Sequence, residues 1–196
     1  SLRLMEARGP NWWPQQVTAP LPADAMHLGL IGGASDRLVA WTASHTRTLQ
    51  LGLVDLLSPA PPLMIEHDYA HHVAGAVDAA GGLHAVWASQ GQMGYVKAGQ
   101  AVTLSIPLSP TASAGGLDLA VTAEGSASVI WEQMDAQGRS LGIVWAPIIS
   151  ETRPVTLAPA GIQPHLAADG AGRMHACWLT LDGRLQTCNS DAWAAV

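Results

Sequence analysis

A short motif recurs along this chain and limits the folds that it can adopt. The clearest copies span 78–87 and 169–178, and both read Asp-x-x-Gly-x-x-His-x-x-Trp. Two weaker copies end on Trp41 and Trp131, so the four tryptophans are separated by 46, 44 and 47 residues. A fixed period of about 20 to 50 residues is typical of repeat architectures. We therefore expect about four equivalent units of roughly 46 residues each.

Each unit can be divided into four short strands. In the second unit an apolar segment at 73–77 ends at the Asp/Gly turn, and the strand that carries the Trp follows at 83–87. That strand is apolar almost throughout, which is typical of a strand covered on both faces. A third strand is expected at 92–97 and a fourth at 101–106. Four antiparallel strands per repeat describe a propeller blade, so the predicted fold is all-β and β-propeller-like.

The two ends of the chain do not coincide with the boundaries of a unit. We expect one domain over 1–196, with units at about 25–70, 71–115, 116–160 and 161–196. Residues 16–21 resemble a fourth strand and residues 2–6 a third strand, so 1–24 is expected to supply a closing strand to the last unit. Either the ring shuts by overlapping its ends, or the chain is a segment of a larger propeller, or it pairs with another copy.

The composition limits the class of partner that this chain is expected to bind. Charged residues make up 12% of the chain, which is about half the usual share, and 48% of the residues are apolar. Such a surface is expected where strands are buried on both faces or where another subunit is met, as in a homo-oligomer. The net charge is −6, and Lys97 is the one lysine. Nucleic acid is therefore not an expected partner, and no apolar run is long enough to predict a membrane span.

The repeat also resembles a known family. Asp78, Gly81, His84 and Trp87, with their counterparts in the fourth unit, resemble the blade repeats of bacterial sialidase-like propeller proteins of the BNR type. The resemblance implies a propeller and, for an active member, glycan hydrolysis by an arginine triad with a Tyr/Glu nucleophile pair. The eight arginines of this chain match no such pattern, so we assign no catalytic residue.

The tryptophans divide into two groups. One aromatic at a fixed place in every unit is expected to pack blade on blade, although such rings also serve as platforms for sugars. This group holds Trp41, Trp87, Trp131 and Trp178. Trp12 and Trp13 lie outside the repeat in a turn-rich stretch, 9–14, and are candidates for ligand or partner contact.

Histidines form the second set of candidates. His67, His71 and His72 lie in one stretch between units, and strand spacing places the first two on one side and His72 on the other. They are kept as candidate ligand- or partner-binding residues, without a predicted metal or cofactor. His84 and His175 occupy the same repeat position, which favours a structural hydrogen bond inside the blade. Their repeat partners are Asp78 and Asp169.

The relative position of the two cysteines can be predicted from the geometry of a hairpin. Asp182-Gly183 is typical of a two-residue turn, and pairing Leu181 with Arg184 would then place Cys177 directly opposite Cys188. Opposed residues of this kind have Cα atoms about 5.5 Å apart, within the range of a disulfide. The bridge requires an oxidising compartment, so an extracellular or periplasmic location is favoured with it; otherwise both are free thiols.

No nucleophile elbow, phosphate-binding loop, zinc site or dinucleotide fingerprint occurs in the sequence. This favours a non-catalytic binding or structural module, a scaffold that engages a partner protein or a glycan. The alternatives are a glycan-processing, sialidase-like hydrolase and an inactive fragment of a larger propeller protein.

Overall fold

A computed structural model describes residues 4–8, 11–15, 25–32, 37–45, 48–55, 63–67, 72–80, 82–89, 91–97, 104–108, 113–148 and 153–193. Side chains are described from residue 72 onward, apart from those of Leu83, Ser89, Ala192 and 104–107. All elements of these segments are strands except one short helix, α1 (Ser190–Trp193). The prediction of an all-β chain is confirmed in this part of the protein.

The strands form antiparallel sheets that follow chain order. We name the four larger sheets blades 1 to 4. Blade 1 contains β3 (Ala25–Gly32), β4 (Arg37–His45), β5 (Thr48–Asp55) and β6 (Leu63–His67). Blade 2 contains β7 (His72–Val77), β8 (Leu83–Ser89), β9 (Gln92–Lys97) and β10 (Leu104–Pro107). Blade 3 contains β11 (Ser113–Val121), β12 (Ala127–Met134), β13 (Ser140–Pro147) and β14 (Val155–Ala158). Blade 4 contains β15 (Ile162–Ala168), β16 (Met174–Leu179) and β17 (Leu185–Asn189).

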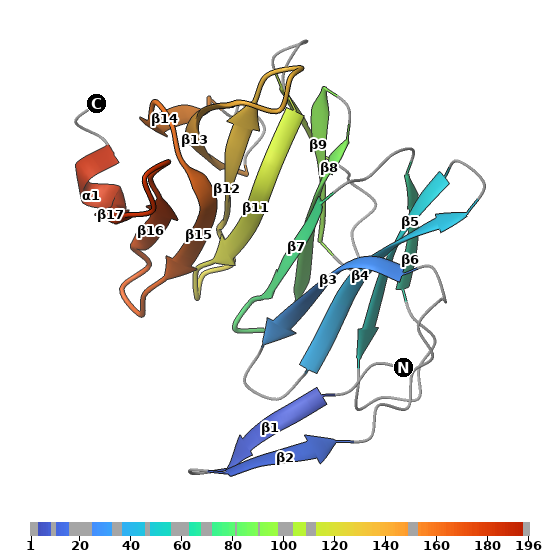
Figure 1. Ribbon diagram of the computed structural model, residues 1–196. Coiled ribbons are helices and arrows are strands. Elements are labelled where there is room, and N and C mark those ends of the chain that lie inside the picture. The colour runs from blue at the N-terminus through green and yellow to red at the C-terminus, as the bar shows by residue number, and fades with distance from the viewer. Residues whose placement is uncertain are drawn as a thin grey trace.

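Figure 1 shows the four blades side by side as a fan, from β3–β6 at one end to β15–β17 at the other. Neighbouring blades meet through their first strands, because β3 contacts β7, β7 contacts β11, and β11 contacts β15. Sheets arranged in this way around a common axis have the architecture of propeller blades. Four strands per unit are confirmed for blades 1 to 3, whereas the described part of blade 4 has three.

The N-terminal strands do not follow the prediction in full. Strand β1 (Leu4–Arg8) pairs with β2 (Asn11–Gln15), and the two form a sheet of their own. In Figure 1 this hairpin lies beside blade 1, at the opposite end of the fan from blade 4. The segment 16–21, predicted to close the last unit, lies outside the described residues.

One turn type recurs at the hairpins of blades 2 to 4. The first residue donates its N–H to the carbonyl of the fifth and, in four turns, accepts the N–H of a glycine at the fourth position. Those glycines have φ between 75° and 84°, which glycine adopts without steric cost. The turns are therefore three-residue loops with a glycine bulge. They span Asp78–Gly82, Thr122–Ser126, Asp135–Arg139, Asp169–Arg173 and Thr180–Arg184.

The last of these turns corrects the predicted cysteine register. Leu179 pairs with Leu185, so Ala176, not Cys177, lies opposite Cys188. Adjacent residues of a strand point to opposite faces, and the two thiols therefore lie on different sides of blade 4. Both cysteines are free, and Trp193 Nε1 donates a hydrogen bond of 2.7 Å to Cys188 Sγ.

The described core lies between blades and contains three of the four repeat tryptophans. One apolar cluster joins blades 2 and 3 and includes Trp131, and a second joins blades 3 and 4 and includes Trp178. Trp87 is also fully buried. The side chain of Trp41 lies outside the described residues. The apolar burial that stabilises the chain is thus concentrated where one blade covers the next.

Candidate functional site

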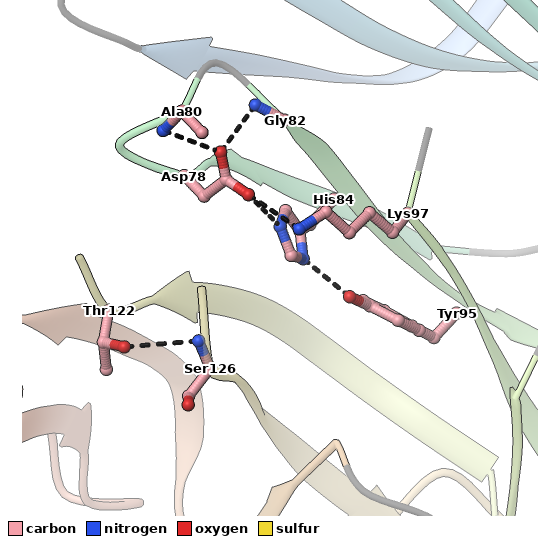
Figure 2. A network of polar contacts seen from close by, with 8 residues as sticks. All are labelled: Asp78, Ala80, Gly82, His84, Tyr95, Lys97, Thr122 and Ser126. Carbon is pink, nitrogen blue, oxygen red and sulfur yellow. Dashed lines mark hydrogen bonds and ion pairs between the residues drawn. The ribbon is translucent and has the colours of Figure 1, made fainter. Parts of the chain in front are cut away.

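The densest polar network surrounds Asp78, the first residue of the motif. Its Oδ1 accepts the backbone N–H groups of Ala80 and Gly82, at 3.0 and 2.6 Å (Figure 2). Its Oδ2 accepts from His84 Nε2 at 3.1 Å and from Lys97 Nζ at 2.9 Å. These donors hold the pKa of the Asp78 carboxyl well below its ordinary value, with Lys97 the largest cause. Asp78 is therefore ionised, and its hydrogen bonds to the N–H groups of Ala80 and Gly82 stabilise the turn that contains it.

His84 extends the network into the blade. Its Nδ1 lies 2.6 Å from the hydroxyl of Tyr95. Burial raises the pKa of Tyr95, so the phenol keeps its proton and donates to Nδ1. Burial also lowers the pKa of His84, so the imidazole is neutral. The other ring nitrogen, Nε2, therefore carries the proton that it donates to Asp78.

The polar side chains of this network are bonded to one another and are largely buried. The side chains of Asp78 and His84 are 4% and 1% exposed, and Lys97, at 29%, is the most accessible member. The Lys97 ammonium is neutralised by the carboxylate. Blade 3 also covers this group, because a Cβ on Gly125 would lie 3.8 Å from Asp78 Oδ2 and 3.9 Å from Lys97 Nζ. An Asp–His–Tyr chain in this setting holds strands together and offers no open reacting atom.

Blade 4 repeats the arrangement in an open setting. Asp169 accepts Ala171 N–H and Arg173 N–H through Oδ1, and its Oδ2 accepts from Arg173 Nε at 2.9 Å and His175 Nε2 at 3.0 Å. These hydrogen bonds lower the pKa of Asp169, with His175 the largest cause. The His175 side chain is 47% exposed, in contrast to its buried counterpart His84.

Blade 3 has the same turn without the Asp–His pair. Thr122 stands at the Asp position, and its Oγ1 accepts Ser126 N–H at 3.3 Å (Figure 2). Ser128 takes the place of the histidine and is buried. The turn geometry is therefore common to the three blades, whereas the Asp–His pair belongs to blades 2 and 4.

A second polar group joins the first strands of blades 3 and 4. Asp118 Oδ2 accepts the N–H of Leu166 at 2.9 Å and lies 3.3 Å from His165 Nδ1. The His165 side chain is 72% exposed. Sequence reasoning missed this pair because 47 residues separate its members and no motif contains either one.

Glu132 is a buried carboxyl that the sequence also did not single out. Burial raises its pKa, and the backbone N–H of Gly116 partly offsets this by donating to it. A Cβ on the neighbouring Gly115 would lie 3.0 Å from Glu132 Oε2. The two glycines occupy a bulge in β11, so the missing side chains make room for the carboxyl.

Other candidates from the sequence are not brought together in the described structure. Trp12 and Trp13 lie in β2 and His67 in β6, but their side chains lie outside the described residues, as does all of His71. His72 is half-buried at the start of β7. Within the described segments, no group of three or more His, Cys, Asp or Glu is placed to hold a metal ion. The same segments contain no helix that is long and apolar enough to span a membrane.

Comparison with known proteins identifies a fold and no family. No family model matches the chain, and no curated protein matches it. The lectin of the fungus Aleuria aurantia, described as a six-bladed β-propeller with a novel fucose recognition mode, is similar in structure, with a TM-score of 0.67 and 11% identity. The match covers 95% of this chain and 65% of the lectin.

A bifunctional GH43-CE protein of Bacteroides eggerthii is similar with a TM-score of 0.51 and 13% identity, over 96% of this chain and 29% of that protein. The chain thus spans less than two thirds of the length of either neighbour. The narrower resemblance to BNR-type proteins stays a prediction. At such low identity the likeness concerns the fold, and it shows that the sheets of this chain are arranged as in β-propeller proteins.

Proposed function

We propose that this chain is a non-catalytic propeller module that acts by binding. The observation that carries the proposal is the state of the Asp78 network. Its aspartate, histidine and tyrosine are the residues best suited to acid–base chemistry, and they are buried and bonded to one another. A general base must reach a substrate proton, and this histidine faces Tyr95 and Asp78 with both ring nitrogens.

A glycan is the ligand class that we propose, with a protein partner as the competing class. The fold is shared with a lectin whose description includes fucose recognition and with a GH43 protein. The exposed His165 ring and the Asp118 carboxylate offer a donor and acceptors that sugar hydroxyls can bond. Only 12% of the residues are charged, which suits a neutral ligand.

A glycan array probed with the labelled chain tests this proposal. We expect binding to a subset of neutral glycans, reduced by His165→Ala and by Asp118→Asn. Asp135→Asn is the matched control, because Asp135 lies in an exposed turn of blade 3 and bonds only within that turn. An array without binding, while a protein partner is captured in a defined complex, would favour the competing class.

A glycan-processing enzyme is the second candidate, and Glu132 is the observation in its favour. A carboxyl whose pKa is raised by burial suits a general acid in glycoside hydrolysis. The distinguishing assay follows the reducing ends released from the array-positive glycans. Turnover by the wild-type chain that is abolished in Glu132→Gln would establish the enzyme and replace the binding proposal.

A further inference from the structure

Gln163 has a backbone conformation that is unusual for its residue type. Its φ is 52°, and it is the one residue other than glycine with a positive φ in the described part of the chain. In this left-handed region the Cβ of an L-residue lies too close to the following carbonyl oxygen, and glycine avoids that contact. Pro164 follows directly and restricts the same backbone further. A glycine at position 163 would therefore adopt this conformation at a lower cost.

The strained residue lies in a bulge of β15. The register between β15 and β16 shifts between Ile162 and His165. The two residues between them, Gln163 and Pro164, together oppose one residue of β16. One common type of bulge carries glycine at its first position, because that position takes a positive φ. In β15 the first position holds glutamine instead.

The matching bulge of blade 3 is built from glycines. The register between β11 and β12 shifts between Ala114 and Leu117, and the two residues between these are Gly115 and Gly116. Both bulges thus lie in the first strand of a blade and face its second strand. A first strand accepts glycine at both positions of such a bulge. The glutamine of blade 4 is therefore not required by the bulge itself.

The two bulges pack against each other at the seam between blades 3 and 4. A Cβ on Gly116 would lie 2.9 Å from Pro164 Cδ and 3.5 Å from Gln163 Cα. The N–H of Gly116 also donates to the carboxyl of Glu132. Gly116 therefore contacts both the backbone of Gln163 and the buried carboxyl. These contacts hold the Gln163 backbone from the side of blade 4 that blade 3 covers.

Further polar groups follow along the same seam. Asp118 lies two residues after Gly116 in β11, and its Oδ2 accepts the N–H of Leu166. His165 lies two residues after Gln163 in β15, with its Nδ1 3.3 Å from the same Oδ2. The Gln163 side chain is exposed. A side-chain amide has a carbonyl acceptor and two N–H donors, which together suit neighbouring sugar hydroxyls.

We infer that Gln163 is a ligand-binding residue whose side-chain amide bonds hydroxyl groups of a neutral glycan at the seam between blades 3 and 4. The inference rests on the glycan binding proposed above and adds a residue that orients the sugar beside Asp118 and His165. Strained residues concentrate at binding sites, where the surrounding structure holds them in place. Glycine would relieve the strain but would remove the amide, so the glutamine is retained for its side chain.

Two substitutions separate the backbone of Gln163 from its amide. Gln163→Gly removes both the strain and the amide, whereas Gln163→Ala removes the amide alone. The urea midpoint should be about 0.2–0.5 M higher for Gln163→Gly than for the wild type, and it should not rise for Gln163→Ala. A midpoint that fails to rise in Gln163→Gly would show that this backbone is not strained, and the inference would be overturned.

Calorimetric titration with the glycan that gives the strongest array signal measures the role of the amide. Both variants should bind about 3- to 10-fold more weakly, because they lose a hydrogen bond to the sugar. Gln186→Ala is the matched control. Gln186 is an exposed glutamine of the same blade, but it lies in the regular pairing of β17 with Trp178. This variant should bind as the wild type does.

The outcomes distinguish this inference from the glycan proposal. Wild-type affinity in Gln163→Ala, or an equal loss of affinity in Gln186→Ala, would overturn the inference and leave the glycan proposal standing. A wild-type chain that binds no glycan on the array would refute both.

Discussion

Replacement of His84 by alanine is the sharpest test of the network in blade 2. The ring is fully buried and bonds Tyr95 at 2.6 Å and Asp78 at 3.1 Å. Its loss leaves a buried hydroxyl without its partner, and each such group costs about 1–3 kcal/mol. The removed ring also leaves a cavity, so we expect the free energy of unfolding to fall by about 2–4 kcal/mol.

Urea unfolding followed by tryptophan fluorescence measures this change. With a slope of about 2 kcal/mol/M, the midpoint should fall by about 1–2 M. His165→Ala is the matched control, because this histidine is exposed and also bonds an aspartate. Its effect should stay within about 0.5 kcal/mol. Equal midpoints for the two variants would refute the reasoning, since burial would then make no difference to the same kind of bond.

A double-mutant cycle separates the hydrogen bond from the cavity. Tyr95→Phe keeps the ring and removes the hydroxyl, and it should cost about 1–2 kcal/mol because His84 Nδ1 loses its donor. The double variant should cost less than the sum of the two single changes, because both remove the same bond. Strict additivity would place the effect of His84→Ala in packing alone.

Three further predictions concern pH and packing. Burial holds the pKa of His84 below its ordinary 6.5, so the unfolded chain binds a proton at this residue more readily than the folded chain does. Urea titrations should therefore show that the free energy of unfolding falls below about pH 6.5, and this fall should be smaller in His84→Ala. Glu132 has a raised pKa, so its contribution is present below its ordinary 4.5 and is lost as the pH rises through the folded value. Glu132→Gln should therefore raise the unfolding free energy at neutral pH and leave it unchanged below 4.5. A Cβ on Gly94 would overlap the indole of Trp87, so Gly94→Ala should lower the melting temperature, with a cost of about 1–3 kcal/mol, whereas Gly170→Ala meets nothing within 4 Å and should be neutral in the same thermal melt.

The strands were predictable from the sequence because their signals are local. The expected third strand at 92–97 coincides with β9, and the expected strands at 73–77 and 83–87 lie within β7 and β8. Apolar runs between Asp/Gly turns depend on residues that are close in the chain. The repeat adds independent evidence, because each unit predicts the same elements again.

The register of the last hairpin was mispredicted although the chain contained the information. Asp182-Gly183 resembles a two-residue turn, but Thr180 takes the position that Asp78 and Asp169 occupy in their turns. Its hydroxyl accepts the N–H of Arg184, as those carboxylates accept the fifth N–H of their turns. Comparison with the other hairpins would have given a three-residue loop and separated the cysteines.

Contacts between blades were not predictable in the same way. The pairing of Asp118 with His165 depends on the angle between two neighbouring blades, which no local pattern specifies. The burial of Glu132 depends on a glycine bulge in the neighbouring strand of its own blade, which no local pattern specifies either. Both candidate functional groups found by the structure therefore depend on contacts between different strands, and only the Asp118–His165 pair joins two blades.

The two clear copies of the motif have the same geometry but differ in burial. Asp78 with His84 and Asp169 with His175 make the same hydrogen bond in the same turn, yet the first pair is sealed under blade 3 and the second is open. The motif therefore specifies a hairpin, and the neighbouring blade decides whether its polar pair is buried.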